Sequence, residues 1–185
     1  GKNILTLVCS LGMDDLAVNI YNQQGHRYLV FQIDKDGNDA FTYICKNNMK
    51  KIFKLVLEDI MINILEYVDL DKINNNNKTL LIIVCETKQS LIGLNLLKKK
   101  FNYNLNHQDD CGKTALMYAI ENNLTKLAIS MIKKMKDVNQ VNNVGETALI
   151  IAARMKNTNV AEELLKNKKI NINNVNDYGR SALIY

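Results

Sequence analysis

The sequence predicts an all-α solenoid of about five stacked units, each a helix-loop-helix followed by a β-hairpin-like finger, with one partial unit at the C-terminal end. The pentad GKTAL at 112–116 returns as GETAL at 145–149 and as GRSAL at 179–183. Weaker copies begin at Gly1, Gly37 and Asn77, so successive copies are 36, 40, 35, 33 and 34 residues apart. A period in this range is the signature of repeat proteins, in which each unit packs only against its neighbours.

Composition supports this architecture and limits the functional classes. The hydrophobic fraction of 47% is enough for a continuous core, and 23% charged residues is ordinary for a globular chain. No apolar run is long enough to cross a bilayer and no leader peptide begins the chain, so we expect no transmembrane segment and an intracellular location, cytoplasmic or nuclear. The absence of proline with many Asn, Lys and Ile residues indicates an AT-rich genome. A viral or protist origin is therefore consistent with the sequence, in the host cell if viral.

The units are expected to begin near residues 1, 34, 74, 109 and 142, with a partial unit from 176, as a single array over residues 1–185. Because both ends of the sequence fall inside a unit, we expect it to be a segment of a longer protein.

Each copy predicts the same local elements. A turn is followed by a residue that caps a helix with its side-chain oxygen: Asn3, Asp39, Thr79, Thr114, Thr147 and Ser181. A first helix of about ten residues has apolar positions one, two, five and six after the cap, as in Ala115, Leu116, Ala119 and Ile120. The second helix has the same type of stripe: Leu127, Ala128, Met131, Ile132; Val160, Ala161, Leu164, Leu165; and Leu16, Ala17, Ile20, Tyr21.

An alternating segment after the second helix predicts the finger. Asp109, Asn142 and Asn176 begin its turn, where their side chains are expected to bond to the backbone. The extra residues at 25–28 predict a longer finger. The extra residues at 58–73 predict a longer second helix or an added turn on the convex side; a dedicated partner-docking helix is the alternative.

The Gly-x-Thr-Ala-Leu pentads, the Asn before each finger and the unit length resemble the ankyrin repeat. The sequence departs from that family at two positions. The proline after the capping Thr is replaced by Ala115, Ala148, Ala182 and Leu80, and the His two residues later is replaced by Met117, Ile150, Ile184 and Ile82. The second replacement removes the side chain that supplies the family's hydrogen bonds between repeats.

Chemically reactive residues are few. Cys9, Cys45 and Cys85 share one slot of the repeat, which predicts buried thiols without disulfide, metal or redox roles, whereas Cys111 lies in a turn. His26 and His107 are predicted to be turn residues, and no phosphate loop, CxxC or HExxH motif is present. We therefore expect that the protein is not an enzyme and that it has neither a cofactor nor a metal site.

The resemblance implies that a partner protein binds the concave surface formed by fingers and first helices, and that such arrays serve as recognition arms of larger assemblies, ubiquitin ligases among them, through regions outside this segment. Cys111, Val144, Met155, Tyr178 and Arg180 are the preferred anchors because Met, aromatic and Arg side chains dominate interfaces. The predicted partner-binding residues are Asp110, Cys111, Lys113, Glu121, Asn122, Asn143, Val144, Glu146, Arg154, Met155, Asp177, Tyr178 and Arg180.

An electrostatic binder is the alternative function. Lysines recur at the ends of the second helices, at 98–100, at 133, 134 and 136, and at 166, 168 and 169, and would form a ladder along one edge. Such a ladder attracts nucleic acid or an anionic membrane surface. The net charge of +5 is modest and no aromatic residues alternate with the lysines, so nucleic acid is not the expected partner.

Overall fold

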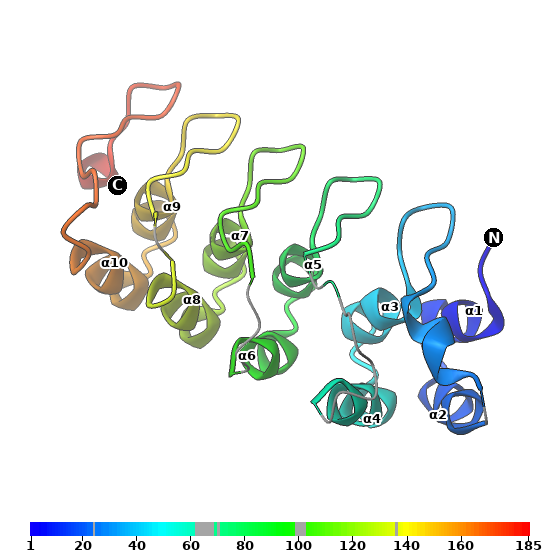
Figure 1. The fold of residues 1–185 in the computed structure, drawn as a ribbon. Coiled ribbons are helices and arrows are strands. Elements are labelled where there is room, and N and C mark those ends of the chain that lie inside the picture. The colour runs from blue at the N-terminus through cyan, green and yellow to red at the C-terminus, as the bar shows by residue number, and fades with distance from the viewer. Residues whose placement is uncertain (24, 62–68, 70, 99–102, 136) are drawn as a thin grey trace. The chain divides into compact units, whose positions relative to one another are not determined.

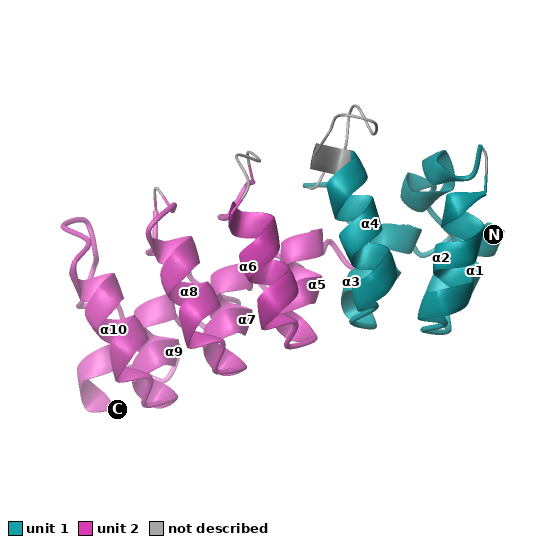
Figure 2. Ribbon diagram, turned by 90° about the horizontal axis from the view of Figure 1, so that it is seen from below, with its two compact units in different colours: residues 1–75 teal, residues 76–185 magenta. Residues whose placement is uncertain are grey.

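A computed structural model describes residues 1–185 except 24, 62–68, 70, 99–102 and 136. The described part of the chain contains ten α-helices and two 3-10 helices (Figure 1). It has no named strand; two isolated antiparallel bridges, Val141 with Thr147 and Val175 with Ser181, close fingers. The predicted all-α repeat architecture is therefore confirmed. The chain divides into two compact units, residues 1–75 and 76–185 (Figure 2), which are described separately.

Unit 1 holds two helix pairs. Helix α1 (Ile4–Ser10) packs on α3 (Ala40–Lys46), and α2 (Asp14–Asn22) packs on α4 (Lys50–Met61). The 3-10 helix η1 (Arg27–Phe31) contacts α1, α2 and α3. The longer finger predicted at 25–28 is therefore wrong: these residues lead into η1, whose Leu29 and Val30 are buried and tie it to the core.

Helix α4 includes the first of the extra residues at 58–73. It has 12 residues, whereas the other second helices have eight or nine. Helix α4 therefore continues through Met61. Residues 62–68 and 70 of the predicted insertion lie outside the described residues.

Unit 2 has two helix layers (Figure 1). The first helices form one layer, the second helices form another, and the fingers project from the first-helix layer on the side away from the second helices. Each first helix contacts the next, and each second helix contacts the next. In chain order the elements are α5 (Leu80–Glu86), α6 (Ser90–Lys98), α7 (Ala115–Glu121), α8 (Thr125–Ile132), α9 (Ala148–Arg154), α10 (Thr158–Leu165) and η2 (Ala182–Ile184).

Side-chain caps begin the first helices as predicted. The side chains of Asn3, Asp39, Thr79, Thr114 and Thr147 each accept a hydrogen bond from the backbone N–H three residues later. Ser181 makes no such bond, and a 3-10 turn follows it instead of an α-helix. Each cap satisfies one of the N–H groups that a helix start leaves without a partner.

The predicted apolar stripes form the core of unit 2. All four stripe residues of α7 and all four of α8 are buried. In the outer copies the stripe is incomplete, because Leu16 of α2 and Leu165 of α10 are exposed. Ile82, Met117 and Ile150, which replace the family's His, are about 1% exposed. These positions therefore contribute apolar packing where the family has a polar side chain.

Gly93 marks the closest approach of α6 and α8. A Cβ atom on Gly93 would lie 2.6 Å from Leu127 Cδ2 and 3.2 Å from Val84 Cγ1. Leu127 is completely buried, so it has little room to move. The glycine is therefore required by space between two second helices.

The first prediction concerns Gly93→Ala. Alanine is the better helix former by about 1 kcal/mol, but the clash with Leu127 costs about 1–3 kcal/mol. We expect a net loss in the free energy of unfolding, measured by urea denaturation with circular dichroism. Lys126→Ala, at an exposed position of α8, is the control and should change stability by less than about 0.5 kcal/mol. A more stable Gly93→Ala protein would contradict the tight α6–α8 contact.

Candidate partner-binding surface

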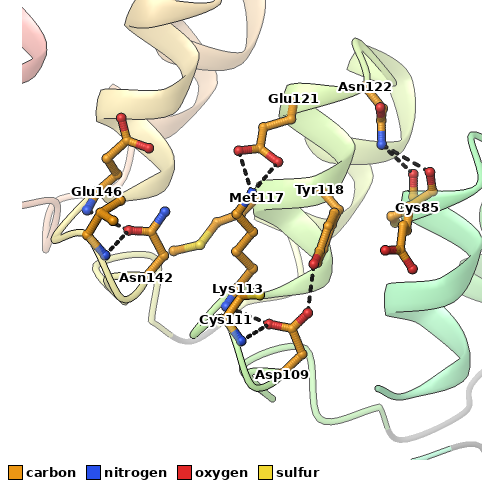
Figure 3. Close-up of polar contacts among 12 residues, drawn as sticks. Cys85, Asp109, Cys111, Lys113, Met117, Tyr118, Glu121, Asn122, Asn142 and Glu146 are labelled. Atoms are coloured by element: carbon orange, nitrogen blue, oxygen red, sulfur yellow. Dashed lines mark hydrogen bonds and ion pairs between the residues drawn. The ribbon is translucent and has the colours of Figure 1, made fainter. Parts of the chain in front are cut away.

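Each finger turn is organised by the side chain of its first residue. The Asp109 carboxylate accepts hydrogen bonds from the backbone N–H groups of Cys111 and Lys113, both at 3.0 Å (Figure 3). Asn142 and Asn176 accept the corresponding bonds through Oδ1, at 2.8–3.1 Å. The predicted bonds from side chain to backbone are therefore present in all three fingers.

A tyrosine nine residues later bonds to the first residue of the turn in three copies: in two its hydroxyl donates to a carboxylate, and in the third Tyr185 accepts from Asn176 Nδ2 at 3.4 Å. The Tyr118 hydroxyl donates to Asp109 Oδ2 at 2.7 Å, and the Tyr43 hydroxyl donates to Asp34 Oδ2 at 2.9 Å. Burial and then the hydrogen bond to Asp109 raise the pKa of Tyr118 well above its usual value, so Tyr118 remains a donor. Burial alone would raise the pKa of Asp34, but hydrogen bonds from Asn38, Tyr43 and Asp36 lower it. The recurring spacing of nine residues between Asp and Tyr is visible in the sequence, and it is the signal that could have predicted these hydrogen bonds.

Backbone hydrogen bonds link successive fingers of unit 2. Asn143 N–H donates to the carbonyl of Cys111 at 3.1 Å, and Asp177 N–H donates to the carbonyl of Val144 at 3.2 Å. Gly112 has a φ of +68°, and a Cβ there would collide with Asn143. Glycine therefore permits both the turn and the contact between fingers.

These links place six predicted residues in one series, which we call the fingertip row: Asp110, Cys111, Asn143, Val144, Asp177 and Tyr178. All six are exposed, and 75% of the surface of Tyr178 is exposed. Arg180 is exposed at the base of the third finger, with its guanidinium 5.9 Å from the Tyr185 ring centroid. The row combines polar or acidic residues with apolar neighbours.

Four other predicted residues form a charge ladder: Lys113, Glu121, Glu146 and Arg154. Lys113 Nζ lies 2.9 Å from Glu121 (Figure 3), and Arg154 pairs with Glu146 at 2.9 and 3.1 Å. Arg154 also approaches Glu121 at 3.7 Å, which joins two repeats. Two positive and two negative charges compensate one another within the ladder.

Glu146 is the clearest departure from the predicted site. It is 8% exposed, so the prediction that it is displayed to a partner is wrong. The two-point contact with Arg154 holds its carboxylate against α9. Lys113, in the same slot of the preceding repeat, is partly exposed.

Asn122 is half-buried and contributes to the stack. Its amide donates to the carbonyls of Cys85 at 3.0 Å (Figure 3) and Glu86 at 3.3 Å, at the end of α5. In unit 1, Asn47 does the same to Cys9 at 2.8 Å. Both asparagines therefore satisfy carbonyls that the end of the preceding first helix leaves open.

Met155 lies apart from the fingertip row. It follows α9 at the end opposite to the finger and lines a shallow depression with Asn123, Thr125 and Asn157. The depression has a mainly polar lining, within which Asn157 Nδ2 donates to Thr125 at 2.9 Å. The structure therefore does not bring Met155 together with the other preferred anchors.

The three buried thiols are poorly reactive because they stay protonated. Burial and then the Asp14 charge raise the pKa of Cys9 to about 12, and burial also raises the pKa of Cys45 and Cys85. Cys111 is exposed, and all four cysteines are free. The predicted buried slot is confirmed.

The two histidines differ. His107 Nε2 donates to the Asn77 carbonyl at 2.8 Å, whereas His26 Nδ1 is buried without a partner among the described residues. The prediction of a satisfied turn residue is therefore confirmed for His107 and wrong for His26. In the described ranges, no group of three or more His, Cys, Asp and Glu side chains is placed to hold a metal ion. None of the helices that the structure describes is long and apolar enough to cross a membrane.

The lysines of the alternative site lie at the second-helix ends. Lys98, Lys133, Lys134, Lys166, Lys168 and Lys169 are exposed; Lys99, Lys100 and Lys136 lie outside the described residues. Lys166 pairs with Glu163 at 2.7 Å, and the hydrogen bond from Lys166, followed by the charges of Lys166 and Lys133, lowers the pKa of Glu163.

The fold and the fingertip row define a class: a helical repeat protein whose units each present a projecting finger. Residues 124–185 match the family model described as ankyrin repeats (3 copies), so this part of the chain consists of ankyrin repeats. Ankyrin repeats generally form protein-interaction modules.

A solved structure shows the same fold. One chain in the structure of the Bd0816 predatory endopeptidase from Bdellovibrio bacteriovorus in complex with immunity protein Bd3460 is similar, with 24% identity and a TM-score of 0.76. The match covers 97% of this chain and 88% of that chain.

The second prediction concerns the charge ladder. Arg154→Ala leaves the Glu146 carboxylate nearly buried without its partner, so we expect a loss of about 2–3 kcal/mol in the free energy of unfolding. Replacing both partners, as Glu146→Leu with Arg154→Met, should recover most of that loss. Urea denaturation of the three proteins tests this, with Lys166→Ala in the exposed pair as a control of little effect. Equal losses in the single and double variants would contradict the proposed pairing.

The third prediction concerns cysteine reactivity. Iodoacetamide at pH 8 should modify Cys111 in the native protein and leave Cys9, Cys45 and Cys85 unmodified, because only a thiolate reacts and the buried thiols stay protonated. Peptide mass spectrometry after timed quenching measures this. In increasing urea, Cys9 and Cys45 report the opening of unit 1 and Cys85 reports that of unit 2. Labelling of Cys85 before any urea is added would contradict its burial.

Proposed function

We propose that the chain recognises a partner protein chiefly through the fingertip row, without catalysing a reaction. The observation that carries this proposal is the division of the predicted site into two parts. In the charge ladder, Lys113, Glu121, Glu146 and Arg154 satisfy one another, so a partner gains little from groups that it must first separate. In the fingertip row, exposed apolar and acidic side chains are held on rigid turns and remain available.

Rigid presentation favours binding. Each tip is fixed by hydrogen bonds within its turn and with a neighbouring finger, so little conformational entropy is lost when a partner docks. Tyr178 offers the largest exposed aromatic surface of the row, and Val144 lies on the preceding finger. Tyrosine is among the residues most enriched at interface hot spots. In a larger assembly, such as a ubiquitin ligase, the module would be the part that selects the bound protein.

A second candidate function uses the lysines at the ends of the second helices. Six exposed lysines among the described residues lie at the ends of the second helices of unit 2, with one ion pair, Lys166 with Glu163, among them. Such an edge would attract an anionic surface, and its binding would weaken steeply with salt. The lysines also complement the negative ends of helix dipoles, which explains them without a partner.

The fourth prediction separates the two functions. The protein is immobilised and incubated with cell lysate at about 150 mM salt, where exposed charges are well screened beyond about 8 Å. A finger variant, Val144→Ser with Tyr178→Ala, should reduce retention of the specific partner at least about tenfold, as loss of a hot-spot residue does. A lysine variant, with Lys133, Lys134 and Lys168 changed to Glu, should retain it. Quantitative mass spectrometry of the bound proteins gives the ratio.

The opposite result would favour the lysines at the second-helix ends as the binding site. If the finger variant keeps every specific partner and the lysine variant loses them, the fingertip row is not the binding surface. Circular dichroism spectra of both variants should match that of the wild-type protein, because all the substituted side chains are exposed.

A further inference from the structure

One slot of the finger turn carries an asparagine bridge in both units. The slot is the residue directly after the Asp or Asn that begins the turn. In unit 1, Asn75 Nδ2 donates to the Lys35 carbonyl at 2.8 Å; in unit 2, Asn143 Nδ2 donates to the Asp110 carbonyl at 2.9 Å. Each bond ties a finger to the finger before it.

Aspartate fills this slot in two fingers, as Asp110 and as Asp177, and Asp177 in the last finger lies in the same orientation as the asparagines. Its Oδ1 lies 2.9 Å from the position that a Cβ on Gly145 would take, and Asn75 Oδ1 stands 2.9 Å from the same point at Gly37. The backbone agrees, because Asp177 N–H bonds to Val144 as Asn75 N–H bonds to Asp36. Asp177 therefore faces the preceding finger in the way that the asparagines do.

A carboxylate in this orientation cannot make the bridge. It has no N–H to donate, so the Asn143 carbonyl receives no bond from it, and among the described residues the Asp177 side chain forms neither a hydrogen bond nor an ion pair. Asparagine has the same shape and would supply the missing donor. Asp177 therefore makes no side-chain bond to the preceding finger. It also places a negative charge at an exposed tip, where no described residue forms an ion pair with it.

The surroundings of Asp177 fit a cation. Tyr178 is the next residue, with 75% of its surface exposed, and an aromatic face attracts Arg and Lys side chains. Val144 on the preceding finger is 42% exposed and offers an apolar contact for the stem of a long basic side chain. The whole chain has a net charge of +5, so this acid does not reflect a generally acidic protein.

We propose that Asp177 and Tyr178 form a receptor for an arginine or lysine side chain of the partner protein. The carboxylate forms a charge-assisted hydrogen bond with the cation, and the tyrosine ring covers the cation from one side. This proposal rests on the proposed function, since it assigns the partner chemistry at one end of the fingertip row. Where stability and binding favour different residues, a destabilising choice at an exposed position is a sign of function.

The fifth prediction begins with stability. Asp177→Asn should restore the bridge to the Asn143 carbonyl and raise the midpoint of thermal unfolding by about 2–4 °C, the shift produced by one additional hydrogen bond in a chain of this size. Glu162→Gln removes the same charge from an exposed position of α10 and should leave the midpoint unchanged. An unchanged or lower midpoint for Asp177→Asn would show that aspartate costs nothing there and would overturn the inference.

The binding arm uses a defined probe. The peptide acetyl-Ser-Gly-Leu-Arg-Leu-Gly-Ser-amide is titrated into the full chain labelled with nitrogen-15, and a peptide with citrulline in place of arginine is the uncharged control. We expect the arginine peptide to shift the amide signals of Val144, Asp177 and Tyr178, with a dissociation constant of about 1 mM. Citrulline, or Asp177→Asn in the protein, should weaken binding about tenfold, whereas Glu162→Gln should not.

Two results would overturn the receptor. One is equal binding of the arginine and citrulline peptides; the other is no shift at these residues up to about 5 mM peptide. Failure here is distinguishable from failure of the proposed function. If Tyr178→Ala releases the partner in the lysate experiment while Asp177→Asn retains it, the fingertip row is the binding surface and the cation receptor is wrong.

Discussion

One side-chain oxygen at the start of each finger determines most of what unit 2 presents. When Asn142 Oδ1 accepts the N–H groups of Val144 and Glu146, it holds Gly145 at a φ of +73° and fixes the direction of the tip. The carbonyl of Val144 then faces the N–H of Asp177, and the fingers become a hydrogen-bonded series. The same turn places Glu146 directly before Thr147, the N-cap residue of α9. Both the exposed row and the buried ion pair therefore follow from one local interaction.

Several polar contacts between repeats are made by asparagines, although the family's histidine is absent from its slot. Apolar Met117 and its equivalents fill the histidine slot with core packing, and Asn122 and Asn143 bridge neighbouring repeats at the helix end and at the finger. Asparagine suits this role because its amide donates while its oxygen remains free to accept. The many asparagines, which the sequence explains by genome composition, also have a structural use at these positions.

Local interactions could be predicted from the sequence, and contacts between repeats could not. Caps such as Thr114 and turn residues such as Asp109 bond within a few residues of themselves, so the repeated pattern shows them directly. The Arg154–Glu121 contact and the Asn122 bridge join residues about one repeat apart, and they depend on the stacking of the helices. The burial of Glu146 could not be predicted for the same reason: its slot is partly exposed in the preceding copy, and here the two-point contact with Arg154 holds the carboxylate against α9.

A repeat protein contains its own controls, and this makes departures from the template informative. Asn75 and Asn143 show the hydrogen bond that an asparagine in the finger slot makes to the preceding finger, whereas Asp110 and Asp177 place a carboxylate in that slot. Asp177 departs from the asparagines by exchanging one amide nitrogen for an oxygen, which removes a donor and adds a charge. Glu146 and Arg154 depart from the Lys113–Glu121 order as a matched pair, so their reversal stays neutral. The compensated departure of Glu146 and Arg154 serves the stack, and the charge of Asp177, which no neighbour compensates, is accounted for by the proposed contact with a cation of the partner.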